Sequence, residues 1–466
     1  MIKYIFPLFA AVFVLAQCNR GTSAEQILAR SKKHYQKECA SCHGTDVAAF
    51  VQKPWKYGNS RLDLIKSIKT GVPDVPQHSF AGRLNDNQIL QLANYLLQNM
   101  TEQKESRIQN AAPKDNKFVS EGMTIRLDTV ATDLENPWGM VFLPNNDLVF
   151  TERSGKLWRL SSDRKKTEIK GVPPTLVESQ GGLLDVELHP DFPKNGIIYL
   201  SYSKFKETSD GKLSTTAVFR AKLEGDTLTY GRDIFVAEPY TKTRYHYGSR
   251  LEFDKKEYLF VSVGDRGMQD SFPQILSNYP GKIHRIKDDG SIPPDNPFLY
   301  QTGALPSMWS YGHRNPQGLA LHPTSGELWE TEHGPRGGDE VNIVQPGKNH
   351  GWPVASYGTH YDGRSFTDIT GRKDIVPPLD YWVPSIGPCG LAFCTSDRYP
   401  AWKGDLLAGS LRFKYLDRCD IENNKLVKHE MLLPNIGRMR CIATDREGYL
   451  YIAVEEPGMI FRLLPE

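Results

Sequence analysis

A short pattern that recurs six times after Gly122 constrains the fold of this chain more than any other feature. Each copy sets alternating apolar residues before a Pro or Asp turn, and an alternating strand such as 257–263 or 448–454 follows. The copies occupy residues 139–144, 184–190, 250–254, 318–323, 390–393 and 440–445. Short alternating strands repeated on this period are typical of a β-propeller. The sequence therefore predicts an all-β six-bladed propeller whose loops meet at one mouth of the axis.

The N-terminal part lacks this repeated pattern and carries the pentad Cys39-Ala40-Ser41-Cys42-His43. In such a pentad both thiols bind covalently to a haem and the His becomes the proximal iron ligand. Helical segments rather than a thioredoxin-like βαβ pattern flank it, which favours haem over a redox CxxC motif. Cys39 and Cys42 are thus the predicted haem attachment residues, and His43 is a predicted metal ligand.

Three helical segments are expected around the pentad: residues 26–37, residues 62–68 before Gly71, and a third capped by Asn85. One face of the third helix is apolar at helical spacing and carries Ile89, Leu92, Ala93, Leu96 and Leu97. This order of elements over residues 25–100 resembles the small class I cytochrome c family. The resemblance implies an all-α domain with a sixth iron ligand on the loop before the last helix.

The sixth ligand departs from the family pattern. The family normally has Met before Pro, whereas this chain has Val75 before Pro76, and a Val side chain cannot bind iron. His78 is the best candidate, and Met100, at the far end of the helix, is a poorer one. Ligation by His43 and His78 would lower the reduction potential relative to His/Met iron.

Residues 1–24 are typical of an export signal, because Lys3 precedes an apolar stretch over 5–16. Leu15-Ala16-Gln17-Cys18 resembles a lipobox in which Cys18 is acylated, although Gln17 stands where a small residue is usual. The alternative is cleavage after Ala24. Both routes predict the periplasm or the cell surface, with membrane contact only through an anchor at Cys18.

Residues 101–120 are polar and charged without an apolar period, so they are expected to link the cytochrome domain to a propeller over 121–466. A net charge of +2 without any basic run argues against a nucleic-acid partner. The four cysteines of the second domain are either disulfide-bonded or buried thiols: Cys389, Cys394, Cys419 and Cys441.

In the second domain, the side chains suited to binding and catalysis are concentrated in the loops. The informative stretches are residues 180–184, 246–250, 311–318, 332–340 and 437–440. Together with the phrase Ser-Met-Trp-Ser-Tyr-Gly-His-Arg-Asn-Pro-Gln-Gly at 307–318, they resemble the soluble pyrroloquinoline-quinone (PQQ)-dependent glucose and aldose sugar dehydrogenases over residues 122–463. The resemblance implies an enzyme that oxidises sugars with PQQ.

PQQ carries three carboxylates, so its site needs several cations. The cofactor-binding residues that the resemblance implies are Gln180, Arg314, Asn315, Arg412, Arg438 and Arg440. Arg412 stands where the family often has Lys. The resemblance also implies Ca²⁺ held by the backbone carbonyls of Gly334 and Pro335, while Asp339 and Glu340 either serve a second Ca²⁺ or cap the loop.

His246 corresponds to the general base of that family. A neutral imidazole takes the proton of the anomeric C1 hydroxyl while hydride passes to the quinone, which leaves a lactone. The glucose dehydrogenase branch has Asp just before this His, whereas this chain has Tyr245. Another residue must therefore orient the imidazole.

Fusion of the two halves would place a one-electron acceptor close to a two-electron donor. We expect a periplasmic or surface quinohaemoprotein that oxidises an aldose to a lactone and passes electrons to haem c, then to a cytochrome or the respiratory chain. Two alternatives stay open: oxidation of sorbosone or another aldehyde, and a non-catalytic propeller that binds sugar or protein beside an electron-carrying cytochrome.

Overall fold

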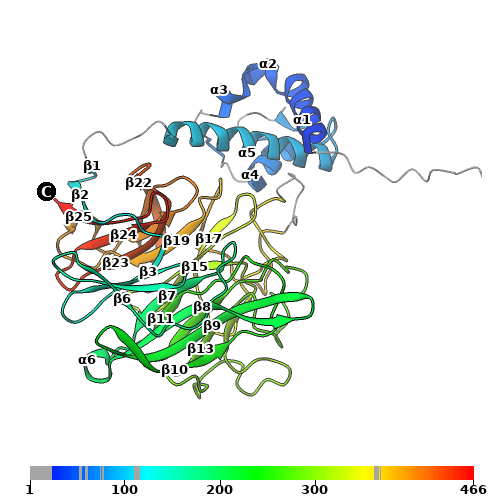
Figure 1. The fold of residues 1–466 in the computed structure, drawn as a ribbon. Coiled ribbons are helices and arrows are strands. Elements are labelled where there is room, and N and C mark those ends of the chain that lie inside the picture. Colours follow the sequence, from blue (N-terminus) through cyan, green and yellow to red (C-terminus); the bar gives the residue numbers. More distant parts are fainter. Residues whose placement is uncertain are drawn as a thin grey trace, which may run out of the picture.

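The computed structural model describes residues 24–51, 55–57, 61–73, 75, 78–109, 116–360, 367 and 369–466. Helices form the N-terminal part and lie over one side of a body built of sheets (Figure 1). The expected export signal before Ala24, with Cys18, falls outside the described residues, as does Pro76. Within the described ranges, no helix has both the length and the apolar character needed to cross a bilayer.

Six antiparallel sheets follow one another along the chain and form the predicted six-bladed propeller. Blade 1 contains β3 (Pro137–Phe142), β4 (Leu148–Glu152), β5 (Lys156–Leu160) and β6 (Lys166–Ile169). Blade 2 contains β7 (Leu183–Leu188), β8 (Ile197–Thr208), β9 (Gly211–Glu224) and β10 (Thr227–Val236). Blade 3 contains β11 (Leu251–Phe253), β12 (Leu259–Val263), β13 (Lys282–Ile286) and β14 (Met308–Tyr311). Blade 4 contains β15 (Pro316–Leu321), β16 (Leu328–Glu332), β17 (Asp339–Ile343) and β18 (Asp380–Trp382). Blade 5 contains β19 (Pro388–Phe393), β20 (Leu406–Ser410), β21 (Leu416–Glu422) and β22 (Lys425–Leu432). Short helices α6 (Phe192–Asn195) and η2 (Pro400–Trp402) lie between strands.

The sixth blade closes the ring by joining strands from both ends of the domain. It contains β23 (Met439–Thr444), β24 (Leu450–Val454), β25 (Met459–Pro465), β2 (Met123–Ala131) and β1 (Lys117–Ser120), in that spatial order. β2 pairs with β25, so that Ile125 lies opposite Pro465. This pairing removes the open edge that a linear row of blades would leave.

The six copies of the sequence pattern coincide with the innermost strand of each blade, β3, β7, β11, β15, β19 and β23, and neighbouring inner strands contact one another. Small residues allow this close approach around the axis. A Cβ at Gly318 in β15 would lie 2.7 Å from the Leu391 side chain of β19. The recurring Gly and alternating apolar residues thus encode the axis-lining strand.

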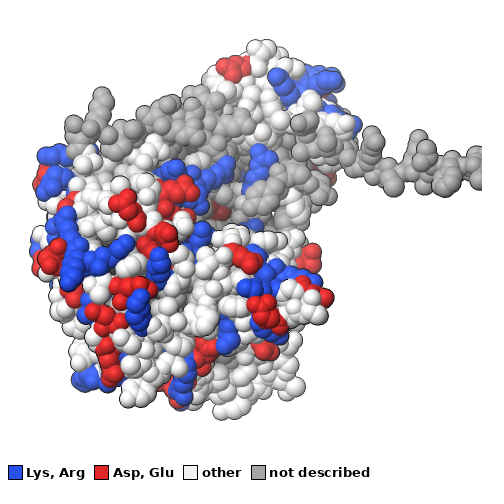
Figure 2. Space-filling view, viewed as in Figure 1, with Lys and Arg blue, Asp and Glu red and all other residues white. Residues whose placement is uncertain are grey.

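Apolar side chains of adjacent blades pack face to face between the sheets. Trp329 of blade 4 is fully buried, and its ring centroid lies 5.3 Å from that of Phe393 in blade 5. The four cysteines of the propeller are buried free thiols, so the disulfide alternative does not hold. Figure 2 shows Lys and Arg interspersed with Asp and Glu over the visible face of the propeller.

The N-terminal domain contains α1 (Ala24–Glu38), α2 (Ala40–His43), α3 (Val47–Val51), α4 (Arg61–Thr70) and α5 (Asp86–Gln109). Asn85 caps α5 as predicted: its Oδ1 accepts from the Gln88 N–H and its own N–H donates to Gln88 Oε1, each at 2.9 Å. Ile89, Leu92 and Leu96 of the expected apolar face are buried in this domain's core.

Regular structure extends from both sides into the segment expected to be a linker. α5 continues to Gln109, because residues 101–109 are mostly good helix formers, and β1 takes up residues 117–120. The polar composition of this segment is therefore compatible with a helix end as well as with a loop.

Candidate active site

A cavity of about 340 Å³ opens at the mouth of the propeller axis. This is within the usual size of a small-molecule site. Its lining residues lie in the inner strands, in the segments that precede them, or in the turns between the second and third strand of a blade. They include five residues predicted from the sequence: Gln180, Asn315, Arg412, Arg438 and Arg440. Residues far apart in the chain thus converge as the fold class requires.

The charge of this cavity is strongly positive. Arg153, Arg412, Arg438 and Arg440 line it, and Glu455 is the carboxylate among its lining residues. Glu455 accepts from Arg440 Nε at 2.7 Å and from Arg438 Nε at 3.3 Å, which fixes both guanidinium groups. Burial lowers the pKa of the nearby His333 to about 3, so this imidazole adds no charge. A ligand with several carboxylates fits this cation set.

His246 lies beside the cavity in the segment that precedes β11, with its side chain 13% exposed. Its backbone is left-handed, with φ 55°, an uncommon conformation for a side chain of this size. Gln180 Oε1 accepts from the His246 N–H at 2.8 Å and thereby ties two predicted site residues together. His246 Nδ1 lies 2.7 Å from Asp265 Oδ1.

Asp265 supplies the orientation that Tyr245 cannot. Its Oδ1 also accepts from the Gly267 N–H at 2.7 Å, and its Oδ2 accepts from Trp352 Nε1 at 2.8 Å. This carboxylate holds the proton on His246 Nδ1 and leaves Nε2 as the acceptor. Tyr245 is 42% exposed and only contacts the imidazole with its ring edge.

The electrostatics keep His246 neutral. Burial first, and then the Arg314 charge, lower its pKa below the usual range, against the opposing pull of Asp265. Burial alone would raise the pKa of Asp265, but the hydrogen bond with His246, the Arg314 charge and the Gly267 N–H outweigh it and lower that pKa. A neutral imidazole beside a carboxylate is the arrangement of a general base near neutral pH.

Arg314 lies in a small hollow that adjoins the cavity at His333 and is also lined by Gly334 and Pro335. Asp339 holds this loop: its Oδ1 accepts from the Gly334 N–H at 2.8 Å, and its Oδ2 accepts from the Gly387 N–H at 2.7 Å. Asp339 therefore caps the loop. A Cβ at Gly334 would lie 2.1 Å from the Gly338 carbonyl oxygen, which explains the glycine.

A buried acidic cluster fixes the backbone beneath Arg314 and Asn315. Glu332 Oε2 accepts from the N–H groups of both residues. His313 lies against it, with Nδ1 3.4 Å from Glu330 Oε1 and 3.7 Å from Glu332 Oε1. Burial alone would lower the pKa of His313, but these two carboxylates outweigh it and raise the pKa to about 9.

In the helical domain, the pentad lies at the end of α1 and in α2. Cys39 is half-buried and Cys42 is exposed. The His43 and His78 rings are neighbours with perpendicular planes: their centroids lie 5.8 Å apart and the planes meet at 86°. His78 Nδ1 lies 3.2 Å from the Ser67 carbonyl oxygen, a contact that places the proton on Nδ1 and leaves Nε2 as the acceptor nitrogen. Met100 packs at the edge of the apolar core.

Arg61, the first residue of α4, joins the helical domain to the propeller. It is 4% exposed, and its guanidinium donates to the carbonyl oxygens of Gly358 and Thr367 at 2.9 Å each, and to that of Ser356 at 3.4 Å. Ser356 also lines the hollow with Gly334 and Pro335. The helical domain therefore contacts the loop that borders the candidate site.

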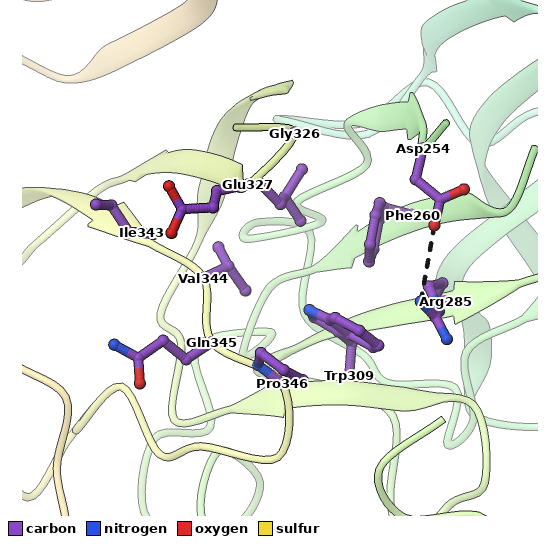
Figure 3. A pocket seen from close by; sticks show the side chains of 11 residues that line it. Asp254, Phe260, Arg285, Trp309, Gly326, Glu327, Ile343, Val344, Gln345 and Pro346 are labelled. Atoms are coloured by element: carbon purple, nitrogen blue, oxygen red, sulfur yellow. Dashed lines mark ion pairs between the residues drawn. The ribbon is translucent and has the colours of Figure 1, made fainter. Parts of the chain in front are cut away.

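A second cavity, of about 300 Å³, opens between blades 3 and 4 (Figure 3). Arg285 stacks on Trp309, 4.0 Å from the ring centroid, and lies 3.7 Å from Asp254. None of the site residues predicted from the sequence lines this cavity. It separates two blades and lies apart from the axial site.

Three residues of the axial site were missed in the sequence: Arg153, Asp265 and Glu455. Each lies just after the second strand of a blade: Arg153 and Glu455 are the first residues after β4 and β24, and Asp265 is the second residue after β12. His333 and Arg412 hold the equivalent place after β16 and β20. Aligning the blades on their second strands would have revealed these positions, because antiparallel strands bring that end to the same mouth as the start of the inner strand.

The fold and this site define a propeller enzyme of the sugar dehydrogenase class, extended by a cytochrome c domain. Residues 134–462 match the family model described as Glucose / Sorbosone dehydrogenase, and residues 26–96 match that of the cbb3-type cytochrome c oxidase subunit III. The chain belongs to the glucose/sorbosone dehydrogenase family.

Individual relatives agree with this assignment. Aldose sugar dehydrogenase YliI of Escherichia coli is 39% identical over 351 residues, which cover 73% of this chain and 93% of that protein. Quinoprotein glucose dehydrogenase B of Acinetobacter calcoaceticus is 32% identical over 255 residues, 49% of this chain and 52% of that protein. The PQQ-bound aldose sugar dehydrogenase of Streptomyces coelicolor superposes with a TM-score of 0.62 at 26% identity, covering 76% of this chain and all of that one.

Proposed function

We propose that this protein oxidises aldose sugars at C1 to lactones with PQQ and Ca²⁺, and that haem c in its own N-terminal domain receives the electrons. The observation that carries the proposal is the pairing of a neutral His246–Asp265 dyad with a cavity lined by four arginines. The PQQ-bound relative and the aldose sugar dehydrogenase relative support the choice of cofactor and substrate class.

PQQ, when bound, supplies the orthoquinone that accepts hydride. Arg153, Arg412, Arg438 and Arg440 would neutralise its carboxylates, while Gln180 and Asn315 would supply directional hydrogen bonds. The carbonyl oxygens of Gly334 and Pro335 are hard ligands of the kind Ca²⁺ prefers. The donor set of the cavity therefore fits a tricarboxylate next to a divalent cation.

His246 Nε2 would accept the proton of the C1 hydroxyl. Asp265 keeps Nδ1 protonated before the reaction and stabilises the imidazolium that forms during it. Because His246 and Asp265 are nearly buried, the local dielectric constant is low and the two charged groups would interact strongly.

For the haem, we propose covalent attachment to Cys39 and Cys42 with His43 and His78 as axial ligands. Two imidazoles on opposite sides of one iron, each bound at about 2 Å, place their ring centroids about 6 Å apart. The observed 5.8 Å agrees with this separation. Bis-His ligation would give a lower potential than His/Met ligation.

The docking of α4 supports an internal electron route. Arg61 is buried against the loop that carries Ser356 and Gly358, beside the proposed Ca²⁺ loop. A tethered acceptor held there would receive electrons without a diffusing partner. A downstream cytochrome or the respiratory chain would then reoxidise the haem in the periplasm or at the cell surface, where an acylated Cys18 would anchor the chain and cleavage after Ala24 would release it.

The test is anaerobic addition of glucose to haem-loaded protein reconstituted with PQQ and Ca²⁺, followed at the haem absorption bands. Reduced haem is expected with the wild type and not with His246→Gln. Dye reduction while the haem stays oxidised would reject the internal route. A panel of aldoses together with sorbosone distinguishes C1 oxidation of cyclic sugars from oxidation of open-chain aldehydes.

A further inference from the structure

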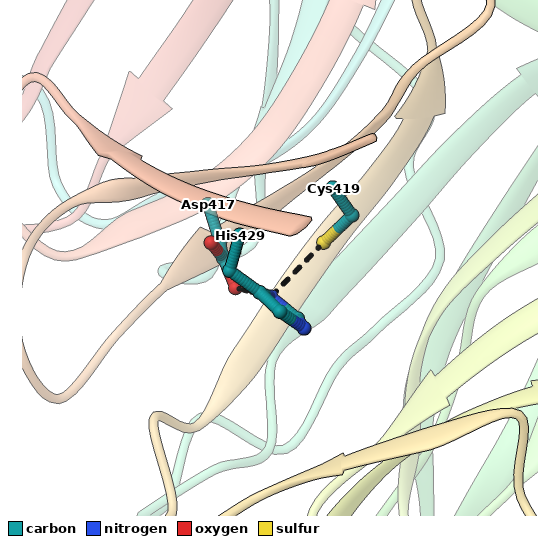
Figure 4. A group of neighbouring side chains, drawn as sticks. All are labelled: Asp417, Cys419 and His429. Atoms are coloured by element: carbon teal, nitrogen blue, oxygen red, sulfur yellow. Dashed lines mark hydrogen bonds and ion pairs between the residues drawn. The ribbon is translucent and has the colours of Figure 1, made fainter. Parts of the chain in front are cut away.

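Four side chains with metal-ligating atoms meet at the outer edge between blades 4 and 5, away from the axis. Asp417 and Cys419 lie on β21, His429 lies on β22, and Asp380 lies on β18 of the neighbouring blade. Figure 4 shows the Asp417 carboxylate and the Cys419 sulfur pointing towards the His429 ring. The ligand atoms of Asp417, Cys419 and His429 lie within 4.8 Å of one another.

The spacing of these atoms is close to that of a tetrahedral zinc site. Zn–S and Zn–N bonds of about 2.3 and 2.05 Å at the tetrahedral angle separate sulfur from nitrogen by about 3.6 Å. Cys419 Sγ lies 3.5 Å from His429 Nδ1. His429 Nδ1 lies 2.9 Å from Asp417 Oδ2, so that pair would open by about 0.4 Å to take a metal between them.

Neighbouring residues form hydrogen bonds that would orient the candidate ligands. His429 Nε2 lies 2.8 Å from Asp380 Oδ2, the contact that fixes the tautomer of a metal-binding imidazole. Trp382 Nε1 donates to Asp417 Oδ2 at 2.7 Å and orients that carboxylate. Asp417 is 1% exposed, and its Oδ1 is buried without a hydrogen-bond partner among the described residues.

We propose that Asp417, Cys419 and His429 bind one Zn²⁺ ion, with water in the fourth position and Asp380 as the positioning residue for His429. The mix of thiolate, imidazole and carboxylate suits zinc rather than the all-oxygen preference of Ca²⁺. The side of His429, which is 34% exposed, leaves access for ion and water. The bound ion would join two strands of blade 5 and, through Asp380, the edge of blade 4.

A reactive Cys–His pair is the other chemistry that these side chains suggest. Cys419 is fully buried, and burial together with the Asp417 charge raises the pKa of its thiol to about 12. A reactive cysteine needs a lowered pKa and exposure, and Cys419 has neither. A divalent cation would itself deprotonate a coordinating thiol, so the same surroundings are compatible with a metal ligand.

The test uses full-length, haem-loaded protein, in which Cys39 and Cys42 are consumed as thioethers and cannot bind zinc. The protein is stripped of metal, given one equivalent of Zn²⁺ and desalted, and zinc is measured by mass spectrometry and Zn K-edge absorption. We expect about one retained zinc with a single sulfur ligand at about 2.3 Å. Zinc that is not retained, or that has no sulfur ligand, would overturn the proposal.

Variants identify the ligands. Cys419→Ser is expected to lose the sulfur shell, whereas Cys394→Ser, another buried thiol that belongs to no such donor group in the described structure, should keep it. Asp380→Asn should weaken zinc binding by about 10- to 100-fold with the sulfur shell retained. A sulfur shell that persists in Cys419→Ser would also overturn the assignment, and the wild-type spectrum decides the matter if a variant fails to fold.

Discussion

Replacing Asp265 by Asn tests the proposed base without changing the shape of the site. In the wild type, the carboxylate pairs with His246 Nδ1 at 2.7 Å in a nearly buried position. Hydrogen bonds to charged groups contribute about 1.5–3 kcal/mol, and this one strengthens when the imidazolium forms. Its loss from the transition state corresponds to a fall in kcat of about 10- to 150-fold.

The hydrogen-bond pattern around Asp265 places the expected loss at the upper end of that range. Its Oδ1 accepts from His246 and Gly267, and its Oδ2 accepts from Trp352. An Asn amide has one oxygen and one NH₂ group, and donors stand on both sides of this position. In either orientation the NH₂ group therefore faces a donor and one hydrogen bond is lost. If the NH₂ faces His246, the imidazole moves its proton to Nε2 and can no longer act as the base.

The pH profile separates this role from simple damage to the loop. Asp265 raises the pKa of His246, against burial and the Arg314 charge, which lower it. Removing the negative charge therefore lowers the pKa of His246 further. Because the base must be neutral, the acidic limb of kcat/KM should move to lower pH while the plateau falls.

The assay is steady-state glucose oxidation with an artificial dye over a range of pH, using protein saturated with PQQ and Ca²⁺. Asp270→Asn, an exposed carboxylate on the same loop, is the matched control and should match the wild type. An unchanged plateau in Asp265→Asn, or an acidic limb that moves to higher pH, would refute the argument that Asp265 orients and stabilises His246.

Three further substitutions test the cofactor site, the domain contact and the haem. Arg440→Lys should weaken PQQ binding by about 10- to 100-fold, because Lys cannot make the two-sided contact with Glu455 and a cofactor carboxylate; titration of apoprotein with PQQ measures this. Arg61→Ala should slow haem reduction by sugar in stopped flow but leave dye-linked turnover unchanged, and Lys66→Ala on the exposed side of α4 is its control. His78→Met should raise the haem reduction potential in a redox titration, and an unchanged potential would exclude His78 as a ligand.

The blade count could be predicted because the recurring pattern marks one particular strand. Inner strands need small residues at the axis and apolar residues on both faces, so their sequences resemble one another. The outer strands have no such shared demand, and β22, for example, is mostly exposed. The closing strands β1 and β2 carry no copy of the pattern either. β1 pairs with its neighbour β2, whereas the pairing of β2 with β25 joins residues more than 300 positions apart.

The candidate site could be predicted where function demands a particular residue type in a fixed phrase, as at His246 and Arg314. Asp265 escaped because its role is defined by a partner 19 residues away, across the β11–β12 hairpin. Its neighbours Gly264 and Arg266 give no separate signal. Only the folded register shows that the end of β12 lies beside the start of β11.

Division of labour between two sets of loops follows from this geometry. Segments that precede inner strands carry His246, Arg314 and Asn315, whereas turns after second strands carry the carboxylates of Asp265 and Glu455 that hold His246 and the arginines. A substitution in the second set would therefore change protonation or charge at the mouth and leave the first set in place. The cytochrome domain docks on a third segment, the loop between β17 and β18, through Arg61. The same loop carries Trp352, whose Nε1 donates to Asp265 Oδ2, so one segment contacts both the helical domain and the carboxylate that orients His246.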